Sequence, residues 1–522
     1  MINKATKVFR VVLGAVLFLL VTTNCTEDED LITELDVSRE FAPVNVRAQI
    51  RTQTTVELTW NPDENVNNYL VEISEDPDFA TLVESIETTA NELPVRILLA
   101  AETLYYVRVQ AISSRGINNS NFSTAVIAQT LTEQIFLPSQ DGDIMSNQAL
   151  LRWVPGSTVT TIILNRGSTD AITRQITPQE VIDGMATITG LTGETDYTAT
   201  LLNGNNIRGI QNFTTEVDRN TGNVITPADD LLQRIADANP GDILLLEAGD
   251  YTSQTGTVVL DKPLTIRGLL SYDKPMLRVS FSIVTGGTDI NLIDLDLSGD
   301  VATELIDTIR YSGADAFDSL VVDGCNVHDY NRSFIAGNES GAVLQSLTVN
   351  NCIVTDVITT GGDFIDFRNS DVFNTSVTNS TFNNCAPGRD FFRIDDAGDT
   401  TQTGITINVL LENCTLYAVC NNSSRRVLYV RYQMNDIIVR NNLITDTEGY
   451  YSNQSRTDEN IEFSNNNYFN APGFFDPTNP RFDGSTTFFN LDPAYQDAEN
   501  GNFSVSNQTI IDNNIGDPRW LR

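Results

Sequence analysis

The sequence predicts an all-β protein, with two small β-sandwich modules followed by a parallel β-helix. Between residues 41 and 216, apolar and polar residues alternate and the pattern breaks at regularly spaced turn residues, which is typical of a sandwich. Beyond residue 226 one short phrase recurs without helical periodicity between its copies, and a repeat of this kind predicts a solenoid of stacked strands. The copies begin 24 to 34 residues apart, at positions 292, 322, 349, 377, 411, 439 and 463.

The charge composition excludes several classes of function. The chain has 522 residues with 69 Asp and Glu, 32 Lys and Arg and one histidine, and its formal net charge is −37. We expect no nucleic-acid partner, because such a chain offers no basic stripe for phosphates. A single histidine, His328, excludes HExxH zinc sites and multi-histidine metal centres. His328 follows Val327 at an expected corner, where we expect an ordinary surface residue.

The first 25 residues have the pattern of a secretory signal. Lys4, Lys7 and Arg10 precede an apolar run from Val11 to Val21, which is too short to span a membrane as a helix. Residues 26–40 hold seven acids and one base, a composition that predicts an extended, self-repelling tether.

Cys25 stands where the apolar run ends, and this arrangement resembles a bacterial lipoprotein signal with Cys25 as the lipidated residue. The acidic stretch behind it, residues 26–30, resembles the surface-export signal of Bacteroidota lipoproteins. The resemblance implies a lipid-anchored protein exposed at the surface of the outer membrane. Ordinary signal-peptidase cleavage, which would leave a secreted protein, is the alternative.

The two sandwich modules follow the tether. Residues 41–131 contain Trp60 on an expected inward strand position and a strictly alternating strand around Tyr105. This pattern resembles a fibronectin type III domain with its tyrosine corner. A second, weaker copy spans residues 134–216, with Trp153 and Tyr197 in the equivalent places. We expect both modules to act as spacers.

Residues 226–522 are expected to form the β-helix, with a capping helix at its start. Leu231, Leu232, Ile235 and Ala236 share one face of that helix. In the recurring phrase an apolar residue and one variable residue are followed by Gly or Asn and then by Cys, Ser or Asn. Removal of Cys25 leaves five cysteines, an odd number, and a stack of buried free thiols is expected. The cysteines at the repeat position are Cys325, Cys352 and Cys414.

A second strand of each coil carries charge at alternate positions. If Ile365, Phe392 and Leu428 point inward, their neighbours form outer columns on successive coils, because equivalent residues of stacked strands are adjacent. One column is Asp366, Arg393 and Tyr429, the next is Arg368, Asp395 and Arg431, and Arg389, Arg425 and Arg426 lie at the edge.

Two interpretations of these columns remain open. Arginine forks suit carboxylates, so the columns could form a groove for an anionic polysaccharide, with Tyr429 against a sugar face. Alternatively, the opposite charges of neighbouring coils stabilise each other as an intramolecular ladder. Asp395, Asp396 and Asp399 lie in one acidic loop, which is either a Ca²⁺ site or a solvated turn.

The β-helix region resembles the pectate-lyase superfamily, and more narrowly the β-helix proteins of Bacteroidota polysaccharide-utilisation systems. The resemblance rests on Pro240–Asp242, Gly249–Tyr251, Lys262–Gly268, the stretch 388–393 and the ending 492–520. It implies a right-handed, single-stranded parallel β-helix at the cell surface that handles acidic, uronate-containing polysaccharides such as pectin or alginate, by either holding or cutting them. Our first hypothesis is a monomer that binds such a polysaccharide for a neighbouring importer. Because Lys262 and Lys274 lie far from the arginines, a lysine-based lyase is not expected. The alternative is a Ca²⁺-assisted lyase with Arg393 or Arg368 as base, and a purely structural solenoid is the third possibility.

Overall fold

The structure is a computed structural model, and it describes residues 38–521 apart from 168, 301–304, 359–360 and 396–404. The predicted signal with Cys25 and most of the tether therefore lie outside the described residues, as do Asp396 and Asp399 of the acidic loop. None of the helices in the described part of the chain has the length and apolar character that a membrane-spanning helix needs.

The first module is a sandwich of two antiparallel sheets. Trp60 and Tyr69 pack edge to face at 5.2 Å between ring centres in its core. The Tyr105 hydroxyl accepts a hydrogen bond from the backbone N–H of Ala100 at 3.1 Å, which is the contact expected of a tyrosine corner. One sheet contains β1 (Val44–Arg51), β2 (Thr55–Asn61) and β5 (Val95–Leu98), and the other contains β3 (Asn68–Ser74), β4 (Glu84–Thr89), β6 (Leu104–Ile112) and β7 (Val126–Gln129).

The second module also has two antiparallel sheets, and Trp153 is fully buried in it. The Tyr197 hydroxyl accepts from the backbone N–H of Thr192 at 3.0 Å, in the same way as Tyr105 does in the first module. The strands are β8 (Gln148–Arg152) with β11 (Met185–Thr189), and β9 (Thr161–Arg166), β10 (Thr169–Gln175), β12 (Asp196–Asn203) and β13 (Asn206–Thr214); the helix α2 is Pro178–Asp183.

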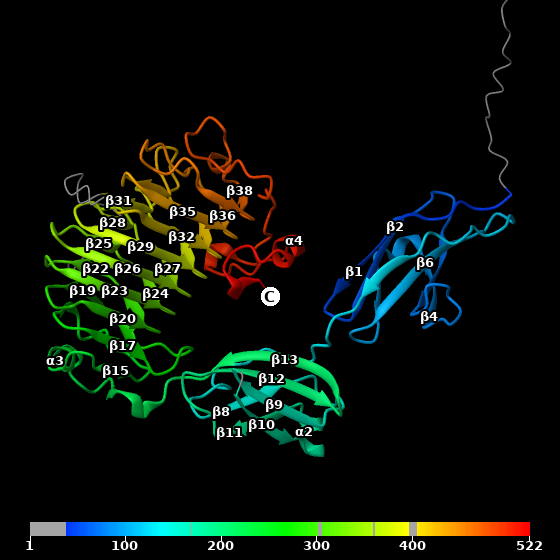
Figure 1. The fold of residues 1–522 in the computed structure, drawn as a ribbon, viewed down its shortest axis with the longest axis horizontal. Coiled ribbons are helices and arrows are strands. Elements are labelled where there is room, and N and C mark those ends of the chain that lie inside the picture. Colours follow the sequence, from blue (N-terminus) through cyan, green and yellow to red (C-terminus); the bar gives the residue numbers. More distant parts are fainter. Residues whose placement is uncertain (1–37, 168, 301–304, 359–360, 396–404, 522) are drawn as a thin grey trace, which may run out of the picture. The chain divides into compact units, whose positions relative to one another are not determined.

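The rest of the described chain is a parallel β-solenoid, as the repeats predict (Figure 1). Successive coils contribute one strand to each of three parallel sheets. In the described residues the ten-stranded sheet contains β14 (Asn223–Ile225), β15 (Ile243–Leu246), β17 (Leu264–Gly268), β20 (Asp289–Ile293), β23 (Ala316–Asp323), β26 (Val343–Asn350), β29 (Asp371–Thr378), β32 (Ile407–Glu412), β35 (Asn435–Arg440) and β37 (Glu462–Ser464).

The other two sheets complete each coil. The seven-stranded sheet of the described residues contains β16 (Gly256–Leu260), β19 (Val279–Ile283), β22 (Asp307–Tyr311), β25 (Ser333–Gly337), β28 (Ile365–Phe367), β31 (Phe392–Ile394) and β34 (Leu428–Val430). The eight-stranded sheet contains, within the same ranges, β18 (Met276–Leu277), β21 (Asp296–Ser298), β24 (Asn326–His328), β27 (Ile353–Thr355), β30 (Thr381–Asn383), β33 (Thr415–Tyr417), β36 (Leu443–Thr445) and β38 (Asn467–Phe469).

A short helix covers the start of the solenoid, and the C-terminal segment packs along its side. The helix α3 (Leu231–Ala236) buries Leu231 and Ile235, whereas Ala236 is exposed, contrary to the expected apolar face. Lys262 donates from Nζ to the carbonyl of Ala236 at 2.8 Å and so stabilises the C-terminal end of α3. The helix α4 (Gln508–Asp512) and a short 3₁₀ turn, Pro518–Trp520, lie along the side of the coils, where Asn513 contacts Asn465 and Arg519 contacts Asn351.

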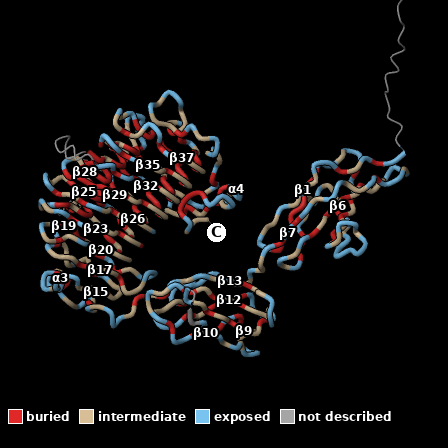
Figure 2. Tube along the Cα trace, in the orientation of Figure 1, coloured by how far each residue is buried: buried red, intermediate tan, exposed pale blue. Residues whose placement is uncertain are grey.

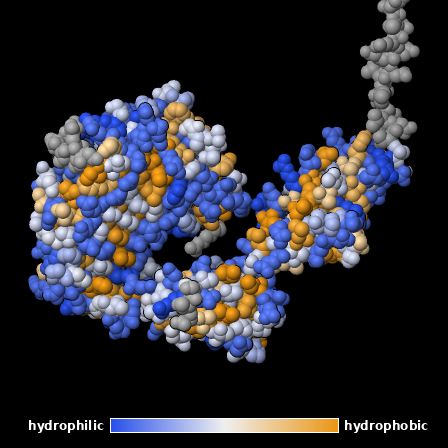
Figure 3. Space-filling model, in the orientation of Figure 1, coloured by the Kyte–Doolittle hydropathy of each residue, from blue (hydrophilic) through white to orange (hydrophobic). Residues whose placement is uncertain are grey.

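The interior of the solenoid is a continuous apolar core, seen as buried residues along the stacked strands in Figure 2. One inward column runs Leu292, Val322, Val349, Val377, Leu411 and Val439, all fully buried and all adjacent in the strand register. Burial of each such side chain contributes roughly 1.5–3 kcal/mol. Hydrophilic residues cover most of the surface visible in Figure 3.

The recurring phrase forms the corner between the ten-stranded and eight-stranded sheets. Its Gly or Asn has a positive φ in each of these coils, from 48° at Asn379 to 63° at Gly324, a conformation that these residues tolerate best. The next residue points inward and, in every one of these coils except that of Ser380, donates to a carbonyl of the preceding coil; Ser380 donates to Thr378 of its own coil. Cys352 donates from Sγ to Val322 at 3.4 Å, and Asn442 donates from Nδ2 to Leu411 at 2.9 Å.

All five cysteines of the described chain are buried and free, and the expected stack at Cys325, Cys352 and Cys414 is confirmed. Cys385 and Cys420 belong to the next corner, after the eight-stranded sheet, where the sequence phrase does not extend. Cys385 donates from Sγ to the carbonyl of Val354 at 3.4 Å, and burial raises its pKa above the usual range.

Candidate functional site: an arginine face on the seven-stranded sheet

The outer surface of the seven-stranded sheet carries most of the residues that the sequence singles out. The strand register places Asp366, Arg393 and Tyr429 in one column, as predicted. The opposite sides of these strands are fully buried, at Ile365, Phe392 and Leu428 among others. We call this outer surface the arginine face; it comprises Arg310, Arg332, Arg368, Arg389, Arg393, Arg425, Arg426 and Arg431, with Asp307, Asp363, Asp366, Asp390, Asp395 and Tyr429.

Stacked phenylalanines support the arginine face from inside. Phe364 lies between Phe334 and Phe391, with ring centres 5.3 Å and 4.7 Å apart and nearly parallel planes. The three rings precede or begin strands of the seven-stranded sheet, so they hold these strands at a constant spacing. The short strands β28 and β31 are thereby rigid supports for the charged side chains above them.

The carboxylates of the arginine face lie beneath its guanidinium groups. The side chains of Asp363, Asp366 and Asp395 are 2%, 0% and 1% exposed. Those of Arg368, Arg393 and Arg431 are 26%, 24% and 29% exposed. Alternation alone would leave both kinds of side chain facing solvent. The longer arginines instead fold over the aspartates, so that the surface offers N–H donors to solvent.

Each buried carboxylate is shared. Arg368 donates from Nε to Asp366 at 2.8 Å and from Nη2 to Asp363 at 3.0 Å. Arg393 and Arg431 both contact Asp395, at 3.1 Å and 2.8 Å. Intramolecular Asp–Arg pairing, one of the two interpretations of the sequence, is therefore present. It does not by itself exclude a ligand, since the exposed edges of the guanidinium groups remain available.

A second group of the same kind lies on earlier coils. Arg310 and Arg332 donate from Nε to opposite oxygens of Asp307, at 2.7 Å and 2.8 Å. They line a cavity of about 430 Å³ together with Ser280 and Ser282. Arg310, Arg332 and Asp307 lie outside the columns that the sequence indicated. The arginine face therefore extends over more coils than the columns around Arg393 indicate.

Arg389 and Arg425 differ from the other arginines of the face. Both are partly buried, and neither forms an ion pair with a carboxylate of the described residues. They occupy equivalent positions on neighbouring coils, because Phe392 pairs with Leu428 three residues further on. The Nε atom of Arg425 is buried without a hydrogen-bond partner in the described structure. Two cations at equivalent positions of neighbouring coils, without a carboxylate partner among the described residues, suit an anionic ligand.

Tyr429 is surrounded by guanidinium groups. Arg426 lies over its ring at 4.0 Å from the centre, and Arg393 and Arg431 lie at 5.3 Å and 5.6 Å. Arg426 is held in turn by both oxygens of Asp390, at 2.9 Å and 2.8 Å. The expected role of Tyr429 as a sugar platform therefore competes with cation–π contacts within the protein.

The acidic residues that sequence reasoning missed, Asp363 and Asp390, share a local signal. Each directly precedes a phenylalanine of the aromatic stack, in Asp363-Phe364 and Asp390-Phe391. Asp363 also accepts a hydrogen bond from the backbone N–H of Asp390 at 3.2 Å, so these two aspartates connect neighbouring coils. The repeated Asp-Phe pair could have identified them.

The expected Ca²⁺ site has little support among the residues that can be described. Asp396 and Asp399 lie outside them, and both oxygens of Asp395 are taken by arginines. Burial raises the pKa of Asp395 in spite of these two guanidinium neighbours. Within the described ranges, no group of three or more His, Cys, Asp or Glu side chains is placed to hold a metal ion.

His328 is not at a corner but ends the strand β24, and it is held by two carboxylates. Its Nε2 lies 3.0 Å from Asp296 and its Nδ1 lies 2.7 Å from Asp329. The hydrogen bond to Asp296, followed by that to Asp329, raises the pKa of His328 to about 9, so the imidazolium form is the stable one at neutral pH.

His328 therefore predicts a pH dependence of stability. Because the pKa of His328 is higher in the folded state than in the unfolded state, the protonated ring stabilises the fold below about pH 6.5. This stabilisation is lost as the pH rises through about 9. Because the ring is 38% exposed, we expect about 1 kcal/mol after solvent screening. The urea midpoint of the wild type should fall more between pH 6 and pH 10 than that of His328→Gln. Equal falls would contradict this role.

The fold and the site together define an all-β protein in which a fibronectin type III domain precedes a β-solenoid. Residues 41–128 match the family model of the fibronectin type III domain. Residues 249–385 match a domain of unknown function, DUF4957, and residues 407–520 match another, DUF5123. A fibronectin type III domain with a solenoid of this kind indicates an extracellular, carbohydrate-related or adhesion-like role.

Comparison with curated proteins found no match. Among solved structures, a segment of two fibronectin type III domains from chicken tenascin is 17% identical, over 33% of this chain and 97% of that chain, with a TM-score of 0.22. The FN1–FN3 domains of chicken CNTN1 are 17% identical over 34% of this chain and 66% of that chain, with a TM-score of 0.15.

Proposed function

We propose that the arginine face binds an acidic, uronate-containing polysaccharide. The observation that carries this proposal is the pair Arg389 and Arg425, which lie on neighbouring coils without a carboxylate partner among the described residues. Around them, partly exposed guanidinium groups lie above buried aspartates. A polymer with carboxylates at regular intervals fits a surface whose arginines repeat along the coils.

The net charge of −37 makes this surface a local exception on the molecule. An anionic polymer is repelled by the rest of the surface, and this repulsion is screened at physiological ionic strength beyond about 8 Å. Binding then depends on short-range, forked hydrogen bonds from arginine. We expect affinity to fall with added salt, but less steeply than for a polycation binding by charge alone.

The anchoring proposal rests on residues 1–40. Cys25 after an apolar run, followed by acidic residues, supports a lipoprotein held at the outer surface of a Bacteroidota cell, where the solenoid would capture glycan for a neighbouring importer. Fractionation of cells that express Cys25→Ala tests it. The variant should leave the membrane fraction, and a variant that remains there would contradict the anchor.

The arginines without carboxylate partners allow a clean test of glycan binding. We expect Arg389→Ala and Arg425→Ala each to weaken binding of polygalacturonate or alginate roughly tenfold, since a hydrogen bond to a charged group contributes about 1.5–3 kcal/mol. Neither change leaves a buried aspartate unpaired, so both variants should fold. Affinity electrophoresis and isothermal titration calorimetry provide the measurement.

Arg440→Ala is the matched control, because Arg440 is 40% exposed on the ten-stranded sheet and pairs with Glu412. It should bind like the wild type. If neither acidic polysaccharide binds the wild-type protein, or if Arg389→Ala and Arg440→Ala behave alike, the proposal is wrong.

The geometry favours holding the polysaccharide over cutting it. An arginine base must lose its proton, whereas the hydrogen bond that Arg368 donates to Asp366 raises the pKa of Arg368 still further. Lyase activity with Ca²⁺ would appear as growing ultraviolet absorbance of unsaturated uronate in the same samples. Growth of that signal in the wild type and its loss in Arg393→Ala would replace the binding proposal by the lyase alternative.

A further inference from the structure

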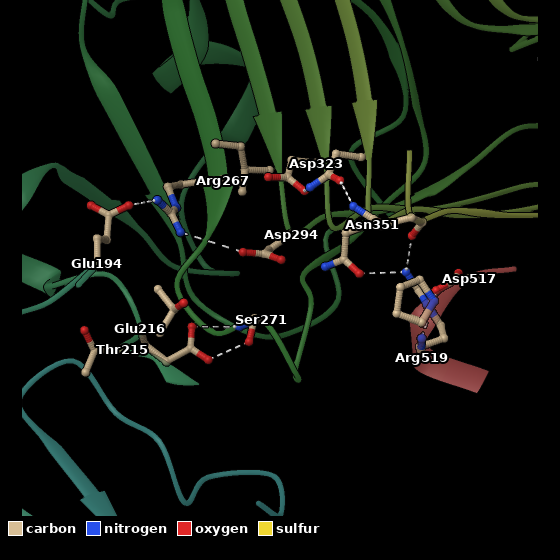
Figure 4. Close-up of a pocket in the computed structure, with 15 residues that line it drawn as sticks. Glu194, Thr215, Glu216, Arg267, Ser271, Asp294, Asp323, Asn351, Asp517 and Arg519 are labelled. Carbon is tan, nitrogen blue, oxygen red and sulfur yellow. Dashed lines mark hydrogen bonds and ion pairs between the residues drawn. The ribbon is translucent and has the colours of Figure 1, made fainter. Parts of the chain in front are cut away.

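A second cavity lies away from the arginine face, at the corner between the ten-stranded and eight-stranded sheets. We call it the turn pocket (Figure 4). Its volume is about 740 Å³, within the range of small-molecule sites. Segments distant in the sequence meet there: the end of the second module, the corners of the early coils, and the C-terminal turn. Each of these segments contributes lining residues, among them Glu194, Glu216, Arg267, Asn351, Asp517 and Arg519.

The turn pocket opens where a ladder of asparagines stops. Along this corner, Asn465 donates from Nδ2 to Asn441 at 2.9 Å, and Asn413 donates to Asn379 at 3.2 Å. In the coil that follows Asp294, the corner residue is Gly324, with φ +63°. A Cβ atom there would lie 2.3 Å from Oδ1 of Asp294. Glycine thus leaves room for the carboxylate of Asp294 at the wall of the pocket.

The polar groups at this wall are incompletely satisfied. The side chain of Asp294 is 13% exposed, and Nη2 of Arg267 lies 3.7 Å from its carboxylate, which is beyond hydrogen-bond distance. No hydrogen bond to the Asp294 carboxylate is found within the described residues, and burial raises the pKa of Asp294 to about 6. The Nε atom of Arg267 is likewise buried without a partner there. Buried polar groups are normally hydrogen-bonded, so each such group calls for an explanation.

The opposite side of the pocket is held firmly by the C-terminal turn. Arg519 donates from Nη2 to Oδ1 of Asn351 at 2.7 Å, and Asp517 accepts from Thr381 at 2.7 Å. These bonds orient the Asn351 amide so that its Nδ2 group, which bonds no other described residue, is left for a ligand. The pocket is therefore a preformed arrangement of donors and acceptors.

The charges distinguish the turn pocket from the arginine face. Its lining contains five carboxylates, on Glu194, Glu216, Asp294, Asp323 and Asp517, against the guanidinium groups of Arg267 and Arg519. A uronate would be repelled. A hydroxyl group both donates and accepts, so it can satisfy a carboxylate on one side and an arginine or amide on the other.

We propose that the turn pocket binds an uncharged saccharide through its hydroxyl groups. Asp294 and Asp323 accept from the sugar, while Arg267 and Asn351 donate to it. This site is separate from the arginine face. The turn pocket lies at a corner and has a mainly acidic lining, whereas the arginine face lies on the outer surface of the seven-stranded sheet and presents guanidinium groups. The protein would then recognise neutral and acidic parts of a glycan at two places.

The test uses the full chain and a panel of neutral gluco-, galacto-, manno-, xylo- and arabino-oligosaccharides in isothermal titration calorimetry. At least one should bind. Asp294→Ala should weaken that binding roughly tenfold or more, because a hydrogen bond to a charged acceptor is lost. Gly324→Asn should abolish it, since the side chain extends the asparagine ladder into the space of Asp294. Asparagine tolerates the positive φ, and circular dichroism with the melting temperature verifies that the variant is folded.

Arg389→Ala is the matched control and should bind the neutral ligand like the wild type, while Gly324→Asn should retain polygalacturonate binding. The two proposals can therefore fail independently. Absence of binding across the neutral panel overturns the inference, as does binding that survives both Asp294→Ala and Gly324→Asn. Binding of glucosamine or CaCl₂ without any neutral sugar would show a cation site in its place.

Discussion

Replacement of Asp395 by alanine is expected to lower the free energy of unfolding by about 3 kcal/mol. Asp395 is 1% exposed and is the shared acceptor of Arg393 and Arg431, at 3.1 Å and 2.8 Å. Without it, Arg431 loses its carboxylate partner and, among the described residues, Arg393 keeps only Asp363, at 3.5 Å. Because both arginines keep some contact with water, we expect the lower end of the range for a broken buried pair. Urea denaturation followed by circular dichroism measures the change.

Glu412→Ala is the control for this prediction. Glu412 pairs with Arg440 at 2.6 Å, but their side chains are 19% and 40% exposed, so its loss should change stability by less than about 1 kcal/mol. A loss for Asp395→Ala as small as that for Glu412→Ala would show that the charges of the arginine face do not support the fold.

Asn442→Ala is the second substitution with a large expected effect, about 3 kcal/mol. The side chain of Asn442 is fully buried and accepts from the backbone N–H of Cys414 at 3.0 Å while donating to the carbonyl of Leu411 at 2.9 Å. Alanine leaves both backbone groups buried without a partner, and each such loss costs about 1–3 kcal/mol. The urea midpoint is the readout.

Two further variants test the mechanism at Asn442. Asn408→Ala, on the exposed side of the same sheet, removes a hydrogen bond to Asn374 and should change stability by less than about 0.5 kcal/mol. Asn442→Cys should recover part of the loss, because Cys414 at the equivalent position donates to the coil before it. If cysteine is no better than alanine, hydrogen bonding to the neighbouring coil is not the cause.

The repeat phrase carries most of the fold information in this sequence. Its apolar positions become the buried column from Leu292 to Val439, and its Gly or Asn becomes the corner with positive φ. Both follow from local properties, namely β-branched strands and residues that tolerate a left-handed conformation. The capping helix α3 was predictable for the same reason, since Asp230 accepts from the N–H of Gln233 as an N-cap.

The alternation of inward and outward residues along the strands did not predict how deeply each charged side chain is buried. The period of two places Asp366 and Arg393 on the same outer side, and the structure agrees. It does not say that the shorter aspartate is covered by its neighbours while the longer arginine reaches solvent. That outcome depends on side-chain length and on adjacent coils, which only stacking brings together.

The turn pocket was harder to predict from the sequence than the arginine face. Arg519 lies more than 200 residues from both Arg267 and Asp294 in the chain, and the stretches that contain the two arginines, Lys262–Gly268 and 492–520, carry no pattern that indicates their contact with one cavity. Gly324 in place of asparagine was visible as a variation of the phrase, but its meaning appears only when Asp294 is seen beside it.

The sequence by itself determined an all-β chain, the order of modules and solenoid, the coil register around Arg393 and the exclusion of histidine-based chemistry. These features follow from local periodicity and composition, which each segment carries independently. Tertiary structure alone decided which arginines have carboxylate partners, that the aspartates lie beneath them, and that a polar cavity forms beside the C-terminal turn. These depend on contacts between coils and between distant segments, where burial and shared hydrogen bonds set the charge that a ligand meets.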